Sequence, residues 1–283
     1  MAPAEKRVCL LTGASGRLGS AFCRLYAAKY HIAAVYRNNA PAATAQNQNY
    51  VDPLNPAAHL PENEHPLFAI RADLASDAEI NRIVELVLAR YGRIDVVINA
   101  AVHYAFGHIV DSKRLLSGLE AQFNVNALVP VKLAAKVARD FWRTRDLENR
   151  RLNRNVINVS SMSGLFVPPR LGHSAYSAAK AALNLFTVHM ANEFQDFGVR
   201  ANACAPTSFP QVVSAESVAR AVRGLDEGLM TGKILVIDRE GERFLGGQAP
   251  STAGTGASPV GKLRAKRLSL SAASSRRTSR PAG

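Results

Sequence analysis

Seven apolar runs of strand length alternate with helix-like stretches through residues 7–239, and this alternation restricts the possible folds more than any other feature. The runs are "RVCLLTG", "HIAAVYR", "LFAIRAD", "DVVINAA", "NVINVSS", "VRANACAP" and "KILVIDR". Strands that are apolar along their whole length are typical of a parallel sheet buried on both faces, and the intervening helices supply right-handed crossovers. The sequence therefore predicts an α/β fold in which helices cover both faces of a doubly wound parallel sheet of about seven strands.

Composition divides the chain into one expected domain and a tail. Residues 1–247 contain all seven runs, interrupted by an irregular insertion at 38–66 that has five prolines and no Lys or Arg. Residues 248–283 carry seven of the 35 basic residues, no acidic residue and no aromatic residue. Such a segment cannot build a core, so we expect a disordered, basic, low-complexity tail. Contact of the tail with an acidic surface or with RNA is the alternative, but the net charge of +13 does not indicate a specific nucleic-acid partner.

Several classes of protein are not expected. No apolar run approaches the ~18 residues that span a membrane, and the first residues lack the apolar segment of a signal peptide. The cysteines Cys9, Cys23 and Cys204 are scattered and odd in number. They are typical of buried small hydrophobic residues in a reducing compartment, not of a metal site. We therefore expect a cytoplasmic protein without a metal ion and without a membrane partner.

The stretch "LLTGASGRLGS" places Gly13, Gly16 and Gly19 between the first strand and a helix. Glycine allows the tight turn, and it lets a pyrophosphate approach the backbone N–H groups at the helix N-terminus. This arrangement is the phosphate-binding unit of Rossmann-like dinucleotide folds. A glycine-rich turn without a ligand is the alternative.

A second motif follows the strand that ends at Ser160 and Ser161. In "YSAAK", Tyr176 and Lys180 are four residues apart, so they share one face of a helix. The carboxyl ends of parallel strands face the ligand crevice, which would bring this pair to the nucleotide. A surface tyrosine stacked on a lysine stem has the same spacing and remains the alternative.

Taken together, these motifs resemble the short-chain dehydrogenase/reductase family over about residues 5–247. The resemblance rests on the glycine turn, "DVVINAA", "FNVNALVP", Ser161 and "YSAAK". It implies a catalytic tetrad of Asn126, Ser161, Tyr176 and Lys180, with NAD(H) or NADP(H) as hydride carrier. Tyr176 would donate the proton to the substrate oxygen, and a Lys180 ammonium would lower its pKa from ~10. Ser161 would orient the substrate, Lys180 would hold the nicotinamide ribose, and Asn126 would support a proton path. A buried asparagine that merely ties a helix to a strand is the alternative for Asn126.

The resemblance also implies a set of cofactor contacts. They are Gly13, Ser15, Gly16, Arg17, Leu18, Gly19, Arg37, Asn38, Asp73, Leu74, Asn99, Ala100, Ala101, Tyr176, Lys180, Pro206 and Thr207. No acidic residue stands near the end of the second strand to accept hydrogen bonds from the adenosine ribose, whereas Arg37 could bind a 2′-phosphate. We therefore expect NADP(H) to be preferred over NAD(H), with Arg17 adding charge for the extra phosphate. A surface arginine that merely ends the strand is the alternative for Arg37.

Arg17, "VYR" and "NALVP" also resemble the pteridine reductases, so the expected substrate is a small-molecule carbonyl or pterin-like compound. Three departures from the family stand out. "NAAV" replaces the Asn-Asn-Ala-Gly turn, Pro206-Thr207 replaces Pro-Gly, and only "SFPQVV" precedes the last helix. The short segment leaves the site open, or covered by 38–66, 102–116 or a partner subunit.

Two functions fit these motifs. The first is NADPH-dependent reduction of a carbonyl or imine, and the second is an NADP-binding sensor or scaffold with little turnover. The apolar helices "NALVPVKLAAKVA" and "AYSAAKAALNLFTVHMA" predict a homodimer or homotetramer.

Overall fold

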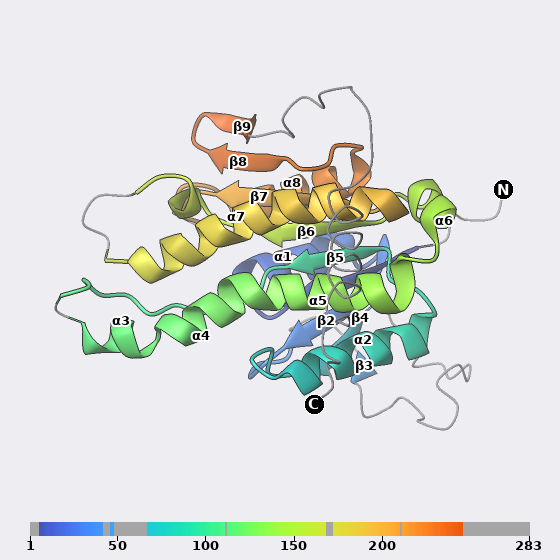
Figure 1. Ribbon diagram of the computed structural model, residues 1–283, viewed down its shortest axis with the longest axis horizontal. Helices are drawn as coiled ribbons and strands as arrows, with labels where there is room; N and C mark the ends of the chain where they lie inside the picture. Colours follow the sequence, from blue (N-terminus) through green and yellow to red (C-terminus); the bar gives the residue numbers. More distant parts are fainter. Residues whose placement is uncertain are drawn as a thin grey trace, which may run out of the picture. The chain divides into compact units, whose positions relative to one another are not determined.

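A single sheet organises the part of the chain that the structure describes. The computed structural model describes residues 6–41, 46–47, 67–110, 112–167, 172–209 and 211–245. Its strands are β1 (Arg7–Thr12), β2 (Tyr30–Tyr36), β3 (Gln46–Asn47), β4 (Leu67–Arg71), β5 (Val96–Asn99), β6 (Asn155–Val159), β7 (Arg200–Pro206), β8 (Ile234–Asp238) and β9 (Gly241–Leu245). They lie in the order β3-β4-β2-β1-β5-β6-β7-β8-β9, and only the β8–β9 pair is antiparallel among these neighbours (Figure 1).

All seven predicted strands are present, and the α/β prediction is confirmed. The expected number of strands was too low, because β3 and β9 complete a nine-stranded sheet among the described residues. β9 lacks an apolar run since Gly241–Phe244 are exposed at the sheet edge. β3 is a two-residue strand inside the expected insertion. The rest of the expected insertion beyond residue 41 and the expected tail at 248–283 lie outside the described residues.

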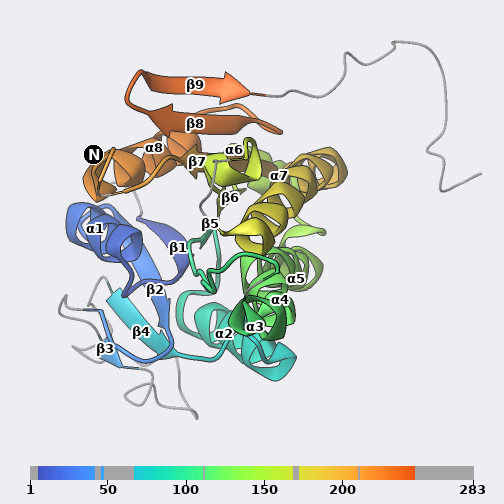
Figure 2. The ribbon, with the colours of Figure 1, turned by 90° about the vertical axis from the view of Figure 1, so that its left-hand side faces the viewer.

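Helices cover both faces of the sheet (Figure 2). They are α1 (Arg17–Tyr26), α2 (Asp77–Tyr91), α3 (Lys113–Ser117), α4 (Leu119–Phe123), α5 (Val129–Val137), α6 (Asp146–Arg151), α7 (Ser174–Phe194) and α8 (Ala215–Glu227). Alternate residues of one strand pack into two hydrophobic cores, one on each face of the sheet. Leu10 packs with α2, α5 and α7, whereas its neighbours Cys9 and Leu11 pack with α1 and α8. This two-sided burial explains why the strands are apolar throughout.

The helix that follows β5 contains an irregular turn. α4 continues through a π-helical turn at Asn124–Leu128 into α5, and the combined helix lies beside α7 in both ribbon views (Figures 1 and 2). A second π-helical turn, Ala138–Trp142, ends α5. Such turns are rare and occur often at functional sites, because they re-aim the side chains that they carry.

The strand order places the carboxyl ends of four central strands together. Thr12 of β1 pairs with Asn99 of β5, and Asn99 pairs with Asn158 of β6. From β1, the chain adds strands outward first on the β2 side and then on the β5 side. A crevice forms where the direction reverses, and ligands of such folds bind there. The loops after β1, β5, β6 and β7 meet at this edge.

Two further observations concern the described residues only. The three cysteines are buried and unpaired. No described helix is long and apolar enough to cross a bilayer.

Candidate active site

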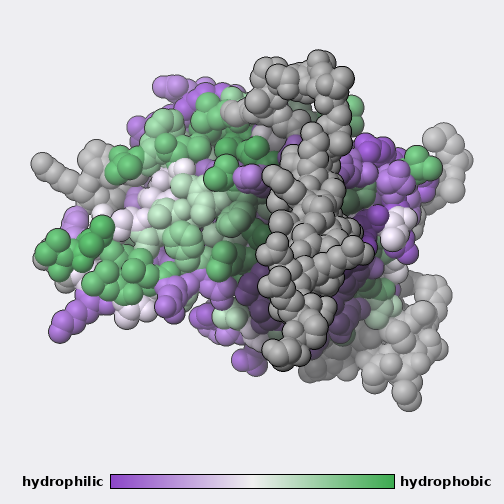
Figure 3. Space-filling model, viewed as in Figure 1, coloured by the Kyte–Doolittle hydropathy of each residue, from purple (hydrophilic) through white to green (hydrophobic). Residues whose placement is uncertain are grey.

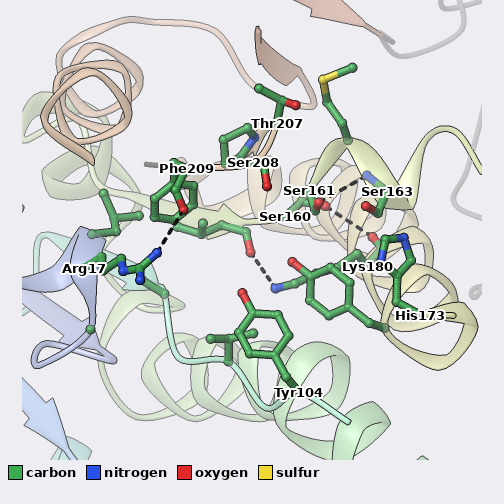
Figure 4. Close-up of a pocket in the computed structure, with 18 of the residues that line it drawn as sticks. Arg17, Tyr104, Ser160, Ser161, Ser163, His173, Lys180, Thr207, Ser208 and Phe209 are labelled. Carbon is green, nitrogen blue, oxygen red and sulfur yellow. Dashed lines mark hydrogen bonds between the residues drawn. The ribbon is translucent and has the colours of Figure 1, made fainter. Parts of the chain in front are cut away.

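A cavity of ≈ 970 Å³ opens at the carboxyl ends of β1, β5, β6 and β7 (Figure 4). Its walls come from residues 13–19, 100–106, 159–167, 173–180 and 206–209. These segments are far apart in the sequence, and the sheet brings them to one edge. The volume falls within the range of natural small-molecule sites.

The glycine loop after β1 has the shape of a phosphate cradle. Gly13 has a φ of +70°, and a Cβ there would lie 2.7 Å from the carbonyl oxygen of Ala100. A Cβ on Gly19 would lie 2.3 Å from the Gly13 oxygen. The N-cap residue of α1, Gly16, has no side-chain hydrogen bond, which leaves N–H groups of the first turn available to an anion. The loop therefore fits the pyrophosphate of a dinucleotide, because glycine is required for the turn and for close packing.

The turn after β5 is fixed to β1 through one hydroxyl. Thr12 Oγ1 accepts hydrogen bonds from the backbone nitrogens of Ala100 at 3.1 Å and Ala101 at 3.2 Å. Asn99 is buried, and its side-chain nitrogen donates to Asn158 Oδ1 at 2.9 Å. Of the three predicted contacts in this turn, only Ala100 lines the cavity. The other two hold the turn in place.

Tyr176 and Lys180 lie one turn apart near the start of α7 and both line the cavity. Lys180 Nζ donates a hydrogen bond to the carbonyl oxygen of Val159 at 2.7 Å, and it lies 5.8 Å from the centroid of the Tyr176 ring (Figure 4). Ser161 Oγ accepts from the Ser163 backbone nitrogen at 3.1 Å and also hydrogen-bonds Tyr176. The structure therefore brings Ser161, Tyr176 and Lys180 together beside the glycine loop.

Burial controls the protonation of this pair. It lowers the pKa of Lys180 from 10.5 to about 7. It also raises the pKa of Tyr176, and Tyr104 adds to this increase while the Ser161 hydrogen bond opposes it. The expected lowering of the Tyr176 pKa by Lys180 is therefore not found. Desolvation is the main cause of both shifts, because both groups are more than nine-tenths buried.

Asn126 has a different place from the other three tetrad residues. It lies in the π-helical turn before α5, fully buried, and does not line the cavity. Its Oδ1 accepts from the His103 backbone nitrogen at 3.0 Å, and its Nδ2 donates to the His103 oxygen at 2.7 Å. The side chain thus ties the loop after β5 to this helix.

A second hollow, of ≈ 640 Å³, lies at the carboxyl ends of β2 and β4. Arg37, Asn38 and Asp73 line it, together with Arg71, which the sequence analysis missed. Arg71 pairs with Tyr36 in the sheet register, and its Nε donates to the Arg37 carbonyl oxygen at 3.2 Å. An arginine at the end of the strand next to β2 was the available signal. The hollow is also lined by Glu79, whose carboxylate is paired with Arg82 at 2.8 Å. Two guanidinium groups at one hollow suit a phosphate.

Arg17 does not join this second hollow. It lines the large cavity, and its Nη1 donates to the Phe209 carbonyl oxygen at 3.5 Å (Figure 4). Partial burial raises the pKa of Tyr104, and the hydrogen bond with Tyr176 and then the Arg17 charge act against that increase. Arg17 and Arg37 therefore belong to different parts of the crevice, unlike the expectation that both meet one phosphate.

The remaining predicted residues divide clearly. The large cavity is lined by Gly13, Gly16, Arg17, Leu18, Gly19, Ala100, Ser161, Tyr176, Lys180, Pro206 and Thr207. Neither hollow is lined by Ser15, Leu74, Asn99, Ala101 or Asn126. Ser15 is exposed, and Leu74 belongs to the core below the sheet edge.

The short segment after β7 forms a wall of the cavity. Thr207, Ser208, Phe209 and Gln211 line it, and Phe209 also packs against the core under α1 and α8. Residues 102–106 supply the facing wall, with Tyr104 as a cavity residue that the sequence analysis missed. An aromatic residue five positions after a central strand was the available signal. Over the described ranges, no three His, Cys, Asp or Glu side chains gather as a metal site would require.

Comparisons with known proteins agree with this geometry. A family model described as short chain dehydrogenase matches residues 7–220. The 3-oxoacyl-[acyl-carrier-protein] reductase of Synechocystis sp. is 29% identical over 224 residues, which are 76% of this chain and 81% of that protein. The L-xylulose reductase of Caenorhabditis elegans is 28% identical over 206 residues, covering 72% of this chain and 71% of that protein.

Solved structures show the same fold. A short chain dehydrogenase from Mycobacterium avium superposes with a TM-score of 0.69 at 22% identity, covering 98% of this chain and 97% of that one. A short-chain dehydrogenase/reductase from Serratia marcescens gives a TM-score of 0.65 at 22% identity, covering 84% and 98%. Because the family model matches most of the sheet and its helices, the chain belongs to the short chain dehydrogenase family and is an NAD(P)-dependent oxidoreductase.

Proposed function

We propose that this protein is an NADPH-dependent reductase that converts a small-molecule carbonyl or imine to the alcohol or amine. The observation that carries the proposal is the meeting of Ser161, Tyr176 and Lys180 with the glycine loop around one cavity. A pterin-like compound belongs to the same chemical class, because its reducible C=N bond accepts a hydride and a proton. We also propose that the enzyme is cytoplasmic, since its cysteines are unpaired and buried.

The residues would divide the work in a simple way. Bound NADPH supplies a hydride to the carbonyl or imine carbon. Negative charge then develops on the substrate oxygen or nitrogen, and the Tyr176 hydroxyl donates its proton there. The Ser161 hydroxyl donates a hydrogen bond to the same atom and fixes its position. Lys180 lies beside the Tyr176 ring, where its ammonium form would stabilise the phenolate left after transfer.

The direct test is oxidation of NADPH, followed at 340 nm, with a panel of carbonyl and pterin substrates. Turnover of at least one member at a rate that depends on enzyme concentration is the expected result. Tight NADPH binding without turnover of any member would instead favour the NADP-binding sensor or scaffold. The short wall after Pro206 is the feature that fits this second function.

We expect NADPH to bind at least about tenfold more tightly than NADH, because a charge-assisted contact to the 2′-phosphate contributes about 1.5–3 kcal/mol. Arg37→Ala should remove most of this preference, and Arg71→Ala should reduce it, since both guanidinium groups line one hollow. Isothermal titration of each variant with both cofactors measures the effect without any substrate.

Two controls make this prediction specific. Arg17→Ala should weaken NADPH and NADH alike, because Arg17 lies with the glycine loop and away from Arg37. Arg239→Ala, at an exposed position beyond β8, should change neither affinity. Equal affinities of the wild-type protein for both cofactors would refute the assignment of Arg37.

We also propose a homodimer or homotetramer formed through α4, α5 and α7. Hydrophobic side chains gather over these helices on the face drawn in Figure 3. They include the exposed residues Leu119, Phe123, Leu128 and Leu185. Apolar patches of this kind usually mark an interface between subunits.

Truncation after Gly247 should leave the oligomer size and the specific activity unchanged, because the tail sequence offers no apolar face for this interface. Leu185→Glu should dissociate the oligomer by placing a charge in the patch. Light scattering of the wild-type, truncated and Leu185→Glu proteins measures the oligomer size of each. A truncated protein that loses assembly would show that the tail takes part in it.

A further inference from the structure

Aromatic rings form a connected wall beside Tyr176. Tyr104 stacks on Phe106 with a centroid distance of 5.4 Å and an interplanar angle of 24°. Tyr104 also contacts the Tyr176 ring at 5.1 Å, and His173 contacts Phe106 and Tyr176 at 6.1 Å each. We refer to Tyr104, Phe106 and His173 as the aromatic wall.

The aromatic wall presents apolar surface to the cavity. Tyr104 is 47% exposed and Phe106 is 53% exposed, and both line the cavity. In the view of Figure 4, Tyr104 lies on one side of the cavity and the hydroxyl residues Thr207 and Ser208 lie on the other. Uncovered aromatic surface grouped in a cavity is what a ligand-binding wall presents.

Backbone contacts hold the rings in position. The Gly107 nitrogen donates to the Gly172 oxygen at 2.7 Å, which joins the loop that carries Phe106 to the segment that carries His173. Gly172 has a φ of +56°, and a Cβ there would lie 3.0 Å from the carbonyl carbon of Gly107. Gln122 donates to the Ala105 oxygen at 3.0 Å between the two rings of the loop. The wall is thus fixed before a ligand arrives, which lowers the entropy cost of binding.

The position of the wall restricts the substrate. A flat ring gains most from stacking on an aromatic side chain, whereas an open acyl chain or a polyol gains little from it. The Tyr104 and Tyr176 ring centroids are 5.1 Å apart, so a ligand ring that packs against Tyr104 brings a carbonyl attached directly to it close to the Tyr176 side chain. That carbonyl would then lie beside the Tyr176 hydroxyl.

We infer that the aromatic wall binds the ring of an aryl or fused-ring carbonyl compound, which makes such compounds the preferred substrate class. This inference rests on the proposed reductase function. It separates this protein from an enzyme that takes flexible acyl chains or sugars, because those substrates would leave Tyr104 and Phe106 uncovered.

The test compares acetophenone, cyclohexyl methyl ketone and 2-octanone, which contain the same number of carbon atoms. The readout is the ratio of kcat/KM for acetophenone to that for cyclohexyl methyl ketone, because effects on the Tyr176 chemistry cancel in it. Tyr104→Leu and Phe106→Leu should each lower the ratio about fivefold, the size of one lost ring contact.

Two matched variants control for other effects. Tyr104→Phe keeps the ring and removes the hydroxyl that hydrogen-bonds Tyr176; that loss acts on both ketones alike, so the ratio should stay at the wild-type value. Phe244→Leu removes an exposed ring on β9, outside the cavity, and should leave the ratio unchanged as well. An equal ratio in the wild-type, Tyr104→Leu and Phe106→Leu proteins would overturn the inference while the reductase function stands.

A binding measurement keeps the two proposals separable. Saturation-transfer NMR gives the affinity of acetophenone for the NADP⁺-loaded protein and requires no turnover. If no ketone is reduced, the reductase proposal fails for this class. Binding of acetophenone that is about fivefold weaker in both leucine variants would still support the aromatic wall, and equal binding would overturn it.

Discussion

Tyr176→Phe is expected to lower turnover by about 10²- to 10⁴-fold, the usual contribution of a positioned proton donor. The ring remains, so its contacts with Tyr104 and His173 are kept and the cavity retains its shape. Only the hydroxyl is lost, with its hydrogen bonds to Ser161 and Tyr104. NADPH affinity should fall by no more than about tenfold, since one neutral hydrogen bond contributes about 0.5–1.5 kcal/mol. Oxidation of NADPH at 340 nm and fluorescence titration of the cofactor measure the two effects.

Tyr91→Phe provides the matched control, because Tyr91 lies on α2 and does not line either hollow. It should keep the wild-type turnover. If Tyr176→Phe keeps it too, Tyr176 is not the donor. Tyr104 is the neighbouring hydroxyl that would then replace it, and Tyr104→Phe in the Tyr176→Phe background would show this by a further loss.

Lys180→Met is expected to have two opposite effects. Turnover should fall at least about 10²-fold, because the variant lacks the charge beside Tyr176, and NADPH affinity should also decrease. The folded protein, however, should become more stable. Burial lowers the pKa of Lys180 from 10.5 to about 7, so the amine costs folding free energy on the order of 5 kcal/mol when the unfolded chain is protonated. Loss of the hydrogen bond to Val159 offsets about 1–2 kcal/mol of the gain.

The pH dependence of this gain follows from the two pKa values. Between pH 7 and pH 10.5 the unfolded chain binds a proton at Lys180 that the folded chain has released. The contribution of Lys180 to the free energy of unfolding of the wild-type protein therefore rises with pH across that window. Lys180→Met should show its largest advantage in urea unfolding at pH 6–7, and the advantage should shrink toward pH 10. Lys132→Met, at an exposed site on α5, is the control, because it removes a lysine charge without removing a buried amine. A pH-independent advantage of Lys180→Met would contradict the burial argument.

Local sequence patterns predicted most of the fold. Each of the seven predicted strands is buried on both faces, so its own residues carry the signal, and the glycine spacing encodes a turn of a few residues. The pairing of Tyr176 with Lys180 follows from helical geometry alone. β9 was not predicted, because it is an edge strand whose exposed residues form no apolar run.

The parts of the site that the sequence did not predict depend on contacts between distant segments. Asn126 fits the expected motif, yet its side chain forms two hydrogen bonds with the backbone of His103. Asn99 and Ala101 are in the expected turn, but Asn158 and Thr12 bind them. These partners are on other strands and helices, so spacing along the chain does not reveal them.

The sequence by itself determined the doubly wound sheet, the glycine turn and the presence of a Tyr–Lys pair, because each follows from periodicity within a few residues. Only the tertiary structure decided where the charges and rings lie. It separated Arg17 from Arg37, and it set Arg71 beside Arg37 through the register of β2 and β4. It also buried Lys180 against the Val159 carbonyl and joined residues 104–107 to 172–173 as one wall. Such features arise where loops from different strands meet at one edge of the sheet, and their burial and neighbours then fix pKa values and ligand contacts.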